Sequence, residues 1–109
     1  MKRATSKSPL DRLREICLAL PGVSETASWG HPNFRTTKRI FASFDNYRGE
    51  ECICFKAERE MQDLLLGDDR FFRAPYVGHL GWVCVRARGR INWRHLRGLL
   101  LESHRLASK

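Results

Sequence analysis

The 109-residue sequence lacks the features of a membrane-spanning or secreted protein. It has no apolar run approaching the roughly 20 residues that a membrane helix requires. The first residues, 1–7, carry positive charge, but no apolar segment follows them, so they do not resemble a secretory signal. We therefore expect a cytoplasmic protein with no membrane partner. Residues 1–7 are expected to be a disordered tail and residues 8–109 a single domain.

Sequence motifs of common catalytic sites are also missing. There is no glycine-rich phosphate loop, no G-x-S-x-G elbow and no H-E-x-x-H pair, so we expect no enzyme and no catalytic residues. No C-x-x-C pair occurs, and cysteines combined with His31 or His79 match no known ligand spacing, which argues against a metal or other cofactor. Without an export signal, the cysteines are expected to be reduced and to act as small hydrophobic residues. They are Cys17, Cys52, Cys54 and Cys84.

Acidic residues are scarce in the last third of the chain. From Arg70 onward there are nine basic residues and one acid, Glu102, a net charge of +8. The stretch 1–69 carries eleven basic and eleven acidic residues and is neutral, so this last third holds the entire excess of the chain. Such an asymmetry favours a polyanionic partner, above all nucleic acid. The alternative is a basic surface that only maintains solubility.

The stretch from Trp82 to Arg88 alternates as a strand does, with Val83, Val85 and Ala87 on one face. The other face, with an indole beside guanidinium groups, suits phosphates or stacked bases. We predict weakly specific, salt-dependent phosphate binding. The predicted residues are Lys56, Arg73, Arg86, Arg88, Arg90, Arg94 and Arg97. Alternatively, the strand's arginines form a charged edge that discourages pairing between molecules.

A second hypothesis is a non-catalytic module that binds a small ligand or a protein. Two aromatic walls with a few polar groups are typical of a ligand pocket. The pocket residues would be Trp29, His31, Lys56, Tyr76, His79 and Trp82. The competing interpretation is that the tryptophans anchor the core and each histidine makes a local hydrogen bond. The pocket hypothesis requires the six side chains to lie together.

The expected order of elements is helix, a meander of about three strands, helix, strand, helix. Ser8 and Asn92 are expected to cap the first and last helices. Residues 25–35 form a broken or edge strand because of Pro32, and Phe71 and Phe72 fill the core. The fold class is α+β: a two-layer domain with a mainly antiparallel sheet, helices on one face and the other face partly open.

Four segments resemble the MmcQ/YjbR family in their order and spacing: residues 18–23, 29–34, 55–56 and 75–83, the last reading P-Y-V-G-H-L-G-W-V. The likeness runs from about Leu10 to Leu106. It implies a compact fold like that of bacterial frataxin (CyaY-like), which has also been compared with a "double wing" DNA-binding domain. The family is commonly described as DNA-binding, which agrees with the partner favoured by the charge.

Likeness to frataxin also raises iron binding, which needs exposed carboxylates. Acids do gather between Glu58 and Asp69, but few of them have the spacing of metal ligands and the protein is basic. We therefore expect no iron site.

Overall fold

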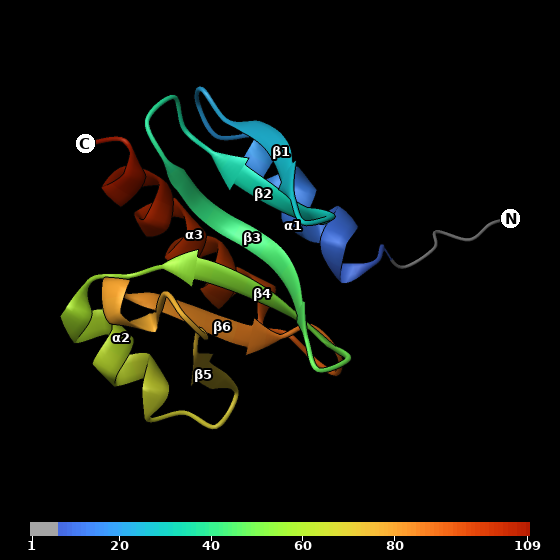
Figure 1. Ribbon diagram of the computed structural model, residues 1–109, viewed down its shortest axis with the longest axis vertical. Helices are drawn as coiled ribbons and strands as arrows, with labels where there is room; N and C mark the ends of the chain where they lie inside the picture. Colours follow the sequence, from blue (N-terminus) through green and yellow to red (C-terminus); the bar gives the residue numbers. More distant parts are fainter. Residues whose placement is uncertain (1–6) are drawn as a thin grey trace, which may run out of the picture.

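The computed structural model describes residues 7–109, which form three α-helices, one short 3₁₀ turn and a six-stranded sheet (Figure 1). In chain order the elements are α1 (Pro9–Leu18), β1 (Ser24–Ser28), β2 (His31–Arg35), β3 (Ile40–Tyr47), β4 (Glu50–Lys56), α2 (Arg59–Leu66), β5 (Phe71–Arg73), η1 (Gly78–Leu80), β6 (Trp82–Arg86) and α3 (Trp93–Ala107). Residues 1–6 of the expected tail lie outside the described part, whereas Lys7 forms an ion pair with Glu15. No helix in the described range is long and apolar enough to cross a membrane.

The sheet is antiparallel throughout, in the order β1-β2-β3-β4-β6-β5. Helices α1 and α3 lie against one face (Figure 1), and α2 packs beside β5 and β6. Between α3 and the sheet, Phe55, Val83 and Leu100 are completely buried. The α+β prediction, with helices packed against an antiparallel sheet, is confirmed.

Both predicted helix caps are present. The Ser8 hydroxyl accepts a hydrogen bond from the Asp11 amide at 3.1 Å, and the Asn92 side-chain oxygen accepts one from the His95 amide at 3.1 Å. Each cap satisfies an amide in the first turn that has no partner within its helix. The Asn92 cap therefore fixes where α3 begins, with the six residues 87–92 between β6 and the helix.

The broken or edge strand expected over residues 25–35 is instead two strands, β1 and β2, which form a hairpin with β1 at the edge of the sheet. Trp29 and Gly30 make its two-residue turn, with φ values of 55° and 80°. Two successive residues with positive φ match the twist of a hairpin, but a tryptophan is unusual there. Similarly, Phe71 and Phe72 belong to a strand, β5, although Phe71 does fill the core as expected. The last predicted strand is two residues too long, since β6 ends at Arg86.

Antiparallel pairing brings three chain reversals to one end of the sheet, on the right of Figure 1. They are the Trp29–Gly30 turn, the Arg48–Gly49 turn, and the segment 87–92 that leads from β6 to α3. We call this the arginine end.

Candidate functional site

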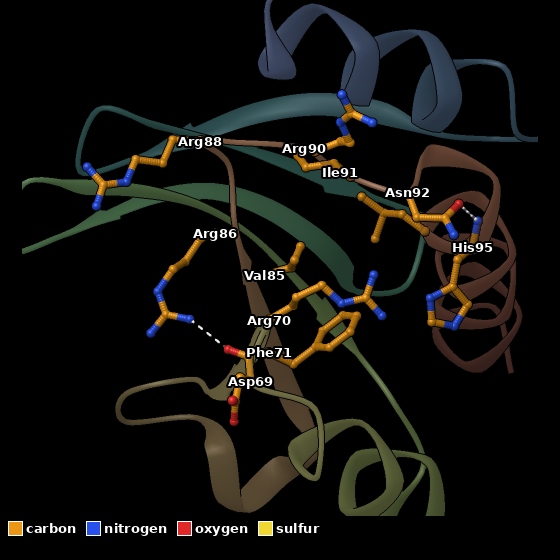
Figure 2. A pocket seen from close by; sticks show the side chains of 11 residues that line it. Asp69, Arg70, Phe71, Val85, Arg86, Arg88, Arg90, Ile91, Asn92 and His95 are labelled. Carbon is orange, nitrogen blue, oxygen red and sulfur yellow. Dashed lines mark hydrogen bonds between the residues drawn. The ribbon is translucent and has the colours of Figure 1, made fainter.

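A cavity of about 270 Å³ opens at the arginine end, between the end of β6 and the start of α3 (Figure 2). Its apolar wall comprises Phe71, Val85, Ile91 and Leu96. Its polar rim comprises Asp69, Arg70, Arg86, Arg88, Arg90, Asn92 and His95. Figure 2 shows the four arginines spread around the rim rather than converging on one point.

Arg86 is held by three contacts. Its guanidinium donates to the Asp69 carbonyl oxygen at 3.1 Å and to a Glu50 carboxylate oxygen at 3.3 Å. It also lies over the Phe72 ring, 4.9 Å from the centroid, a favourable position for a cation. Arg86 is therefore positioned before any ligand arrives.

The other three arginines differ in how far neighbouring carboxylates neutralise them. Arg70 donates to both carboxylate oxygens of Asp68, and this hydrogen-bonded guanidinium lowers the pKa of the Asp68 carboxyl to about 2. The Arg88 side chain is 86% exposed and lies 3.7 Å from Glu50. Arg90 has no ion pair with any residue in the range 7–109. The rim therefore keeps an excess of positive charge, strongest toward Arg88 and Arg90.

The first turn of α3 adds backbone donors to this rim. Asn92 caps the helix, and His95 in the first turn also lines the cavity. The start of a helix carries partial positive charge. His95 packs edge-on against the Phe71 ring at 6.1 Å between centroids, which links the polar rim to the apolar wall. Cationic side chains on an apolar wall can hold an anionic group that also has an apolar or aromatic part.

Only part of the predicted phosphate-binding set gathers here. Arg86, Arg88 and Arg90 line the cavity, while Arg94 and Arg97 are exposed on α3 and do not line it. Lys56 and Arg73 lie elsewhere: Lys56 pairs with Trp82 and Arg73 with Val83, whereas Arg86 pairs with Cys52. Four residues along β4 separate Cys52 from Lys56, a distance of about 13 Å.

The six residues of the predicted ligand pocket do not lie together. Trp29 and Tyr76 are 97% and 91% exposed and project from loops. Lys56 and His79 line two different cavities, although Lys56 and Trp82 are register partners. His31 begins β2 at the arginine end, whereas Trp82 begins β6 at the opposite end. The structure therefore gives no common pocket in which all six could contact one ligand.

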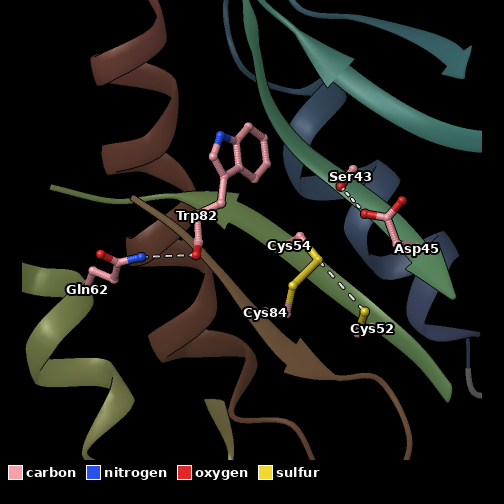
Figure 3. Close-up of a disulfide and its surroundings, with 7 residues drawn as sticks. All are labelled: Ser43, Asp45, Cys52, Cys54, Gln62, Trp82 and Cys84. Carbon is pink, nitrogen blue, oxygen red and sulfur yellow. Dashed lines mark hydrogen bonds between the residues drawn. A yellow bond between two sulfur atoms is a disulfide. The ribbon is translucent and has the colours of Figure 1, made fainter. Parts of the chain in front are cut away.

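The sheet face opposite α1 and α3 carries a second, smaller cluster. Cys52, Cys54 and Cys84 are buried there, and Cys54 and Cys84 form a disulfide (Figure 3). The expectation of four reduced cysteines is thus wrong for this pair. The reason is the register of β4 and β6, which sets the two residues directly opposite each other. Cys17 and Cys52 are free and buried, as expected.

A family model described as YjbR matches residues 18–106. The chain belongs to the YjbR family. Two solved structures resemble it in fold: a Deinococcus radiodurans protein described as having a DUF419 domain, and a protein from Pseudomonas syringae. The first has a TM-score of 0.80 at 23% identity and covers 95% of this chain and 83% of its own. The second has a TM-score of 0.77 at 14% identity and covers 98% and 99%. No curated protein matches.

The family assignment confirms the resemblance inferred from the sequence, yet the cavity of this YjbR protein includes residues that sequence reasoning did not select. Arg70 and His95 line it, and Glu50 tethers two of its arginines. Arg70 contributes to the uneven charge of the chain, and this uneven charge is the one sequence signal that could have identified it as a site residue. The sequence offers no comparable signal for His95 or Glu50, because they reach the site through strand pairing and helix placement.

Proposed function

We propose that this YjbR protein binds nucleic acid through phosphate contacts at the arginine cavity. The observation that supports the proposal most is the gathering of Arg70, Arg86, Arg88 and Arg90 on one rim beside the capped start of α3. Guanidinium groups and helix N-termini are frequent phosphate donors in nucleic-acid complexes. Cations spread along a rim suit the successive phosphates of a polymer better than one isolated phosphate.

Binding of this kind is mostly electrostatic and weakly specific. If Arg86, Arg88 and Arg90 each neutralise one phosphate of duplex DNA, the logarithm of affinity falls with the logarithm of salt with a slope of about −2.7. Raising salt about fourfold then weakens binding about 40-fold. Glu50 holds Arg86 and Arg88 near their binding positions while reducing their net charge.

The test is fluorescence anisotropy with labelled duplex and single-stranded oligonucleotides over a series of salt concentrations. Arg86→Gln, Arg88→Gln and Arg90→Gln combined should remove most of the affinity and of the salt slope. The matched control removes three charges at the opposite end of the sheet, from the exposed Lys38, Arg39 and Arg59. Equal losses in both triple variants, or no binding at low salt, would show that the cavity does not carry the interaction.

The apolar wall favours a second candidate, a small anionic ligand. Phe71, Val85, Ile91 and Leu96 give the cavity a hydrophobic interior that phosphates alone would not need. Calorimetry with pyrophosphate and with a nucleoside triphosphate separates the two functions. Saturable one-to-one binding of either compound, with no binding of oligonucleotides, would replace the first proposal with the second.

A further inference from the structure

Three cysteines meet on the sheet face opposite α1 and α3 (Figure 3). Their sulfur atoms all lie within 4.8 Å of one another. Cys52 and Cys54 alternate on β4 and so point to the same side, with 3.7 Å between their sulfurs. Cys84 lies opposite Cys54 on β6, with 4.1 Å between the two Cα atoms, and forms the disulfide with it. Two paired strands therefore fix the positions of all three sulfurs.

The cluster is closed to solvent. Cys52 and Cys84 are 0% exposed and Cys54 is 2% exposed. Partly buried side chains pack around the three sulfurs: Tyr47, Phe72, Val77 and Trp82. No histidine or carboxylate in the described part of the chain belongs to this group of potential ligands. The site offers sulfur donors that are closed to solvent, with Asp45 as the register partner of Cys52 on β3.

We propose that the reduced protein binds one monovalent copper ion through the sulfurs of Cys52, Cys54 and Cys84. Thiolates are soft ligands that select Cu(I) over harder cations. Structural zinc sites are almost always closed by four protein ligands, and this group supplies three. Three sulfurs at mutual distances of a few ångströms can surround a copper ion after the two bonded sulfurs separate.

The oxidised and copper-bound states exclude each other. A dithiol reductant transfers two electrons and two protons to the Cys54–Cys84 bond, giving two thiols and the oxidised reductant. Cu(I) then displaces three thiol protons, which pass to solvent, and three copper–sulfur bonds form. In a reducing compartment the dithiol form is the expected one.

The test uses the whole chain, reduced with a phosphine under anaerobic conditions and titrated with Cu(I) against bicinchoninate as a chromophoric competitor. We expect one equivalent per chain, a thiolate-to-copper ultraviolet band, and three sulfur ligands by X-ray absorption. Cys52→Ser, Cys54→Ser and Cys84→Ser should each weaken binding at least tenfold. Cys17→Ser is the matched control, because Cys17 is buried in the helix layer, away from the cluster.

The oxidised wild-type protein provides a second control that involves no substitution. It keeps the Cys54–Cys84 bond and should bind at least tenfold more weakly than the reduced protein. Equal binding by the two forms, loss of binding on Cys17→Ser alone, or a preference for Zn²⁺ over Cu(I) in the reduced form would overturn the proposal. Circular dichroism of each variant separates loss of the site from loss of the fold.

Discussion

Gly81 occupies a position where any side chain would be strained, which makes Gly81→Ala a strong test of the fold around β6. Its φ is +99°, and an added Cβ would lie less than 3.0 Å from the carbonyl oxygen of Ala57. The two residues are also linked, since the Ala57 amide donates to the Gly81 carbonyl oxygen at 3.0 Å. The neighbouring backbone must therefore move if a methyl group is added.

The expected loss of stability in Gly81→Ala is the sum of three effects. Left-handed backbone costs a non-glycine residue about 1–2 kcal/mol, and relieving the overlap with the Ala57 carbonyl costs about 1–3 kcal/mol. Reduced freedom of the unfolded chain returns about 0.4–1 kcal/mol. We expect Gly81→Ala to lower the free energy of unfolding by about 2–4 kcal/mol, a large part of the roughly 5–15 kcal/mol typical of a domain.

Gly89→Ala is the matched control. Gly89 also has positive φ, at +85°, but no atom lies within 4 Å of an added Cβ. Gly89→Ala should lower the free energy of unfolding by about 1 kcal/mol. The difference between the two variants then measures the cost of the overlap between the added Cβ at position 81 and the Ala57 carbonyl oxygen. Urea unfolding followed by tryptophan fluorescence gives both free energies. If Gly81→Ala costs no more than Gly89→Ala, the close approach to Ala57 does not constrain the fold.

Three further predictions concern charge, titration and turn geometry. Glu50→Gln should raise the affinity for DNA about threefold in the anisotropy assay, because it frees two cavity arginines. The distant Glu60→Gln is the control and should leave the affinity unchanged. An unchanged affinity in Glu50→Gln would contradict the prediction. Burial raises the pKa of Cys17 to about 12, above the 9.0 of an exposed thiol. The unfolded chain therefore loses this proton first, and Cys17 alone should lower the stability by about 1.4 kcal/mol per unit from about pH 9 to 12; Cys17→Ala should reduce the slope measured in urea titrations by about that amount. Trp29→Asn should raise the midpoint of urea unfolding, since asparagine suits positive φ and the indole is 97% exposed; a lower midpoint would mean that the indole makes stabilising contacts.

Features encoded by neighbouring residues were predictable from the sequence. The caps at Ser8 and Asn92 depend on a few adjacent positions. The alternation of β6 correctly assigned Val83 and Val85 to the core. Arg86, Arg88 and Arg90 lie together in space partly because they are close in sequence. Local chemistry was enough in each case.

Features that depend on which strands pair could not be predicted. The Cys54–Cys84 contact requires β6 to lie beside β4 in one register, and a shift by one residue would turn one cysteine to the other face. The role of Glu50 follows from the same pairing. The Trp29–Gly30 turn was missed for another reason: tryptophan rarely adopts positive φ, so the hairpin contradicts the local preference of its own sequence.

The side chain of Phe72 contacts both Arg86 of the arginine cavity and the cysteine cluster. Its ring lies under the Arg86 guanidinium, 4.9 Å from ring centroid to guanidinium carbon, and it also packs against the buried cysteine cluster. Copper binding requires the sulfurs of Cys54 and Cys84 to separate, and Phe72 pairs directly with Cys84 across β5 and β6. Any movement of the ring would therefore change the surface that supports Arg86. The contacts of Arg86 with Glu50 and with the Asp69 carbonyl involve no cysteine, so they would limit that change. A change of sulfur chemistry would thus reach Arg86 both through the Phe72 ring and through Cys52, its register partner on β4, while its contacts with Glu50 and Asp69 hold it in place.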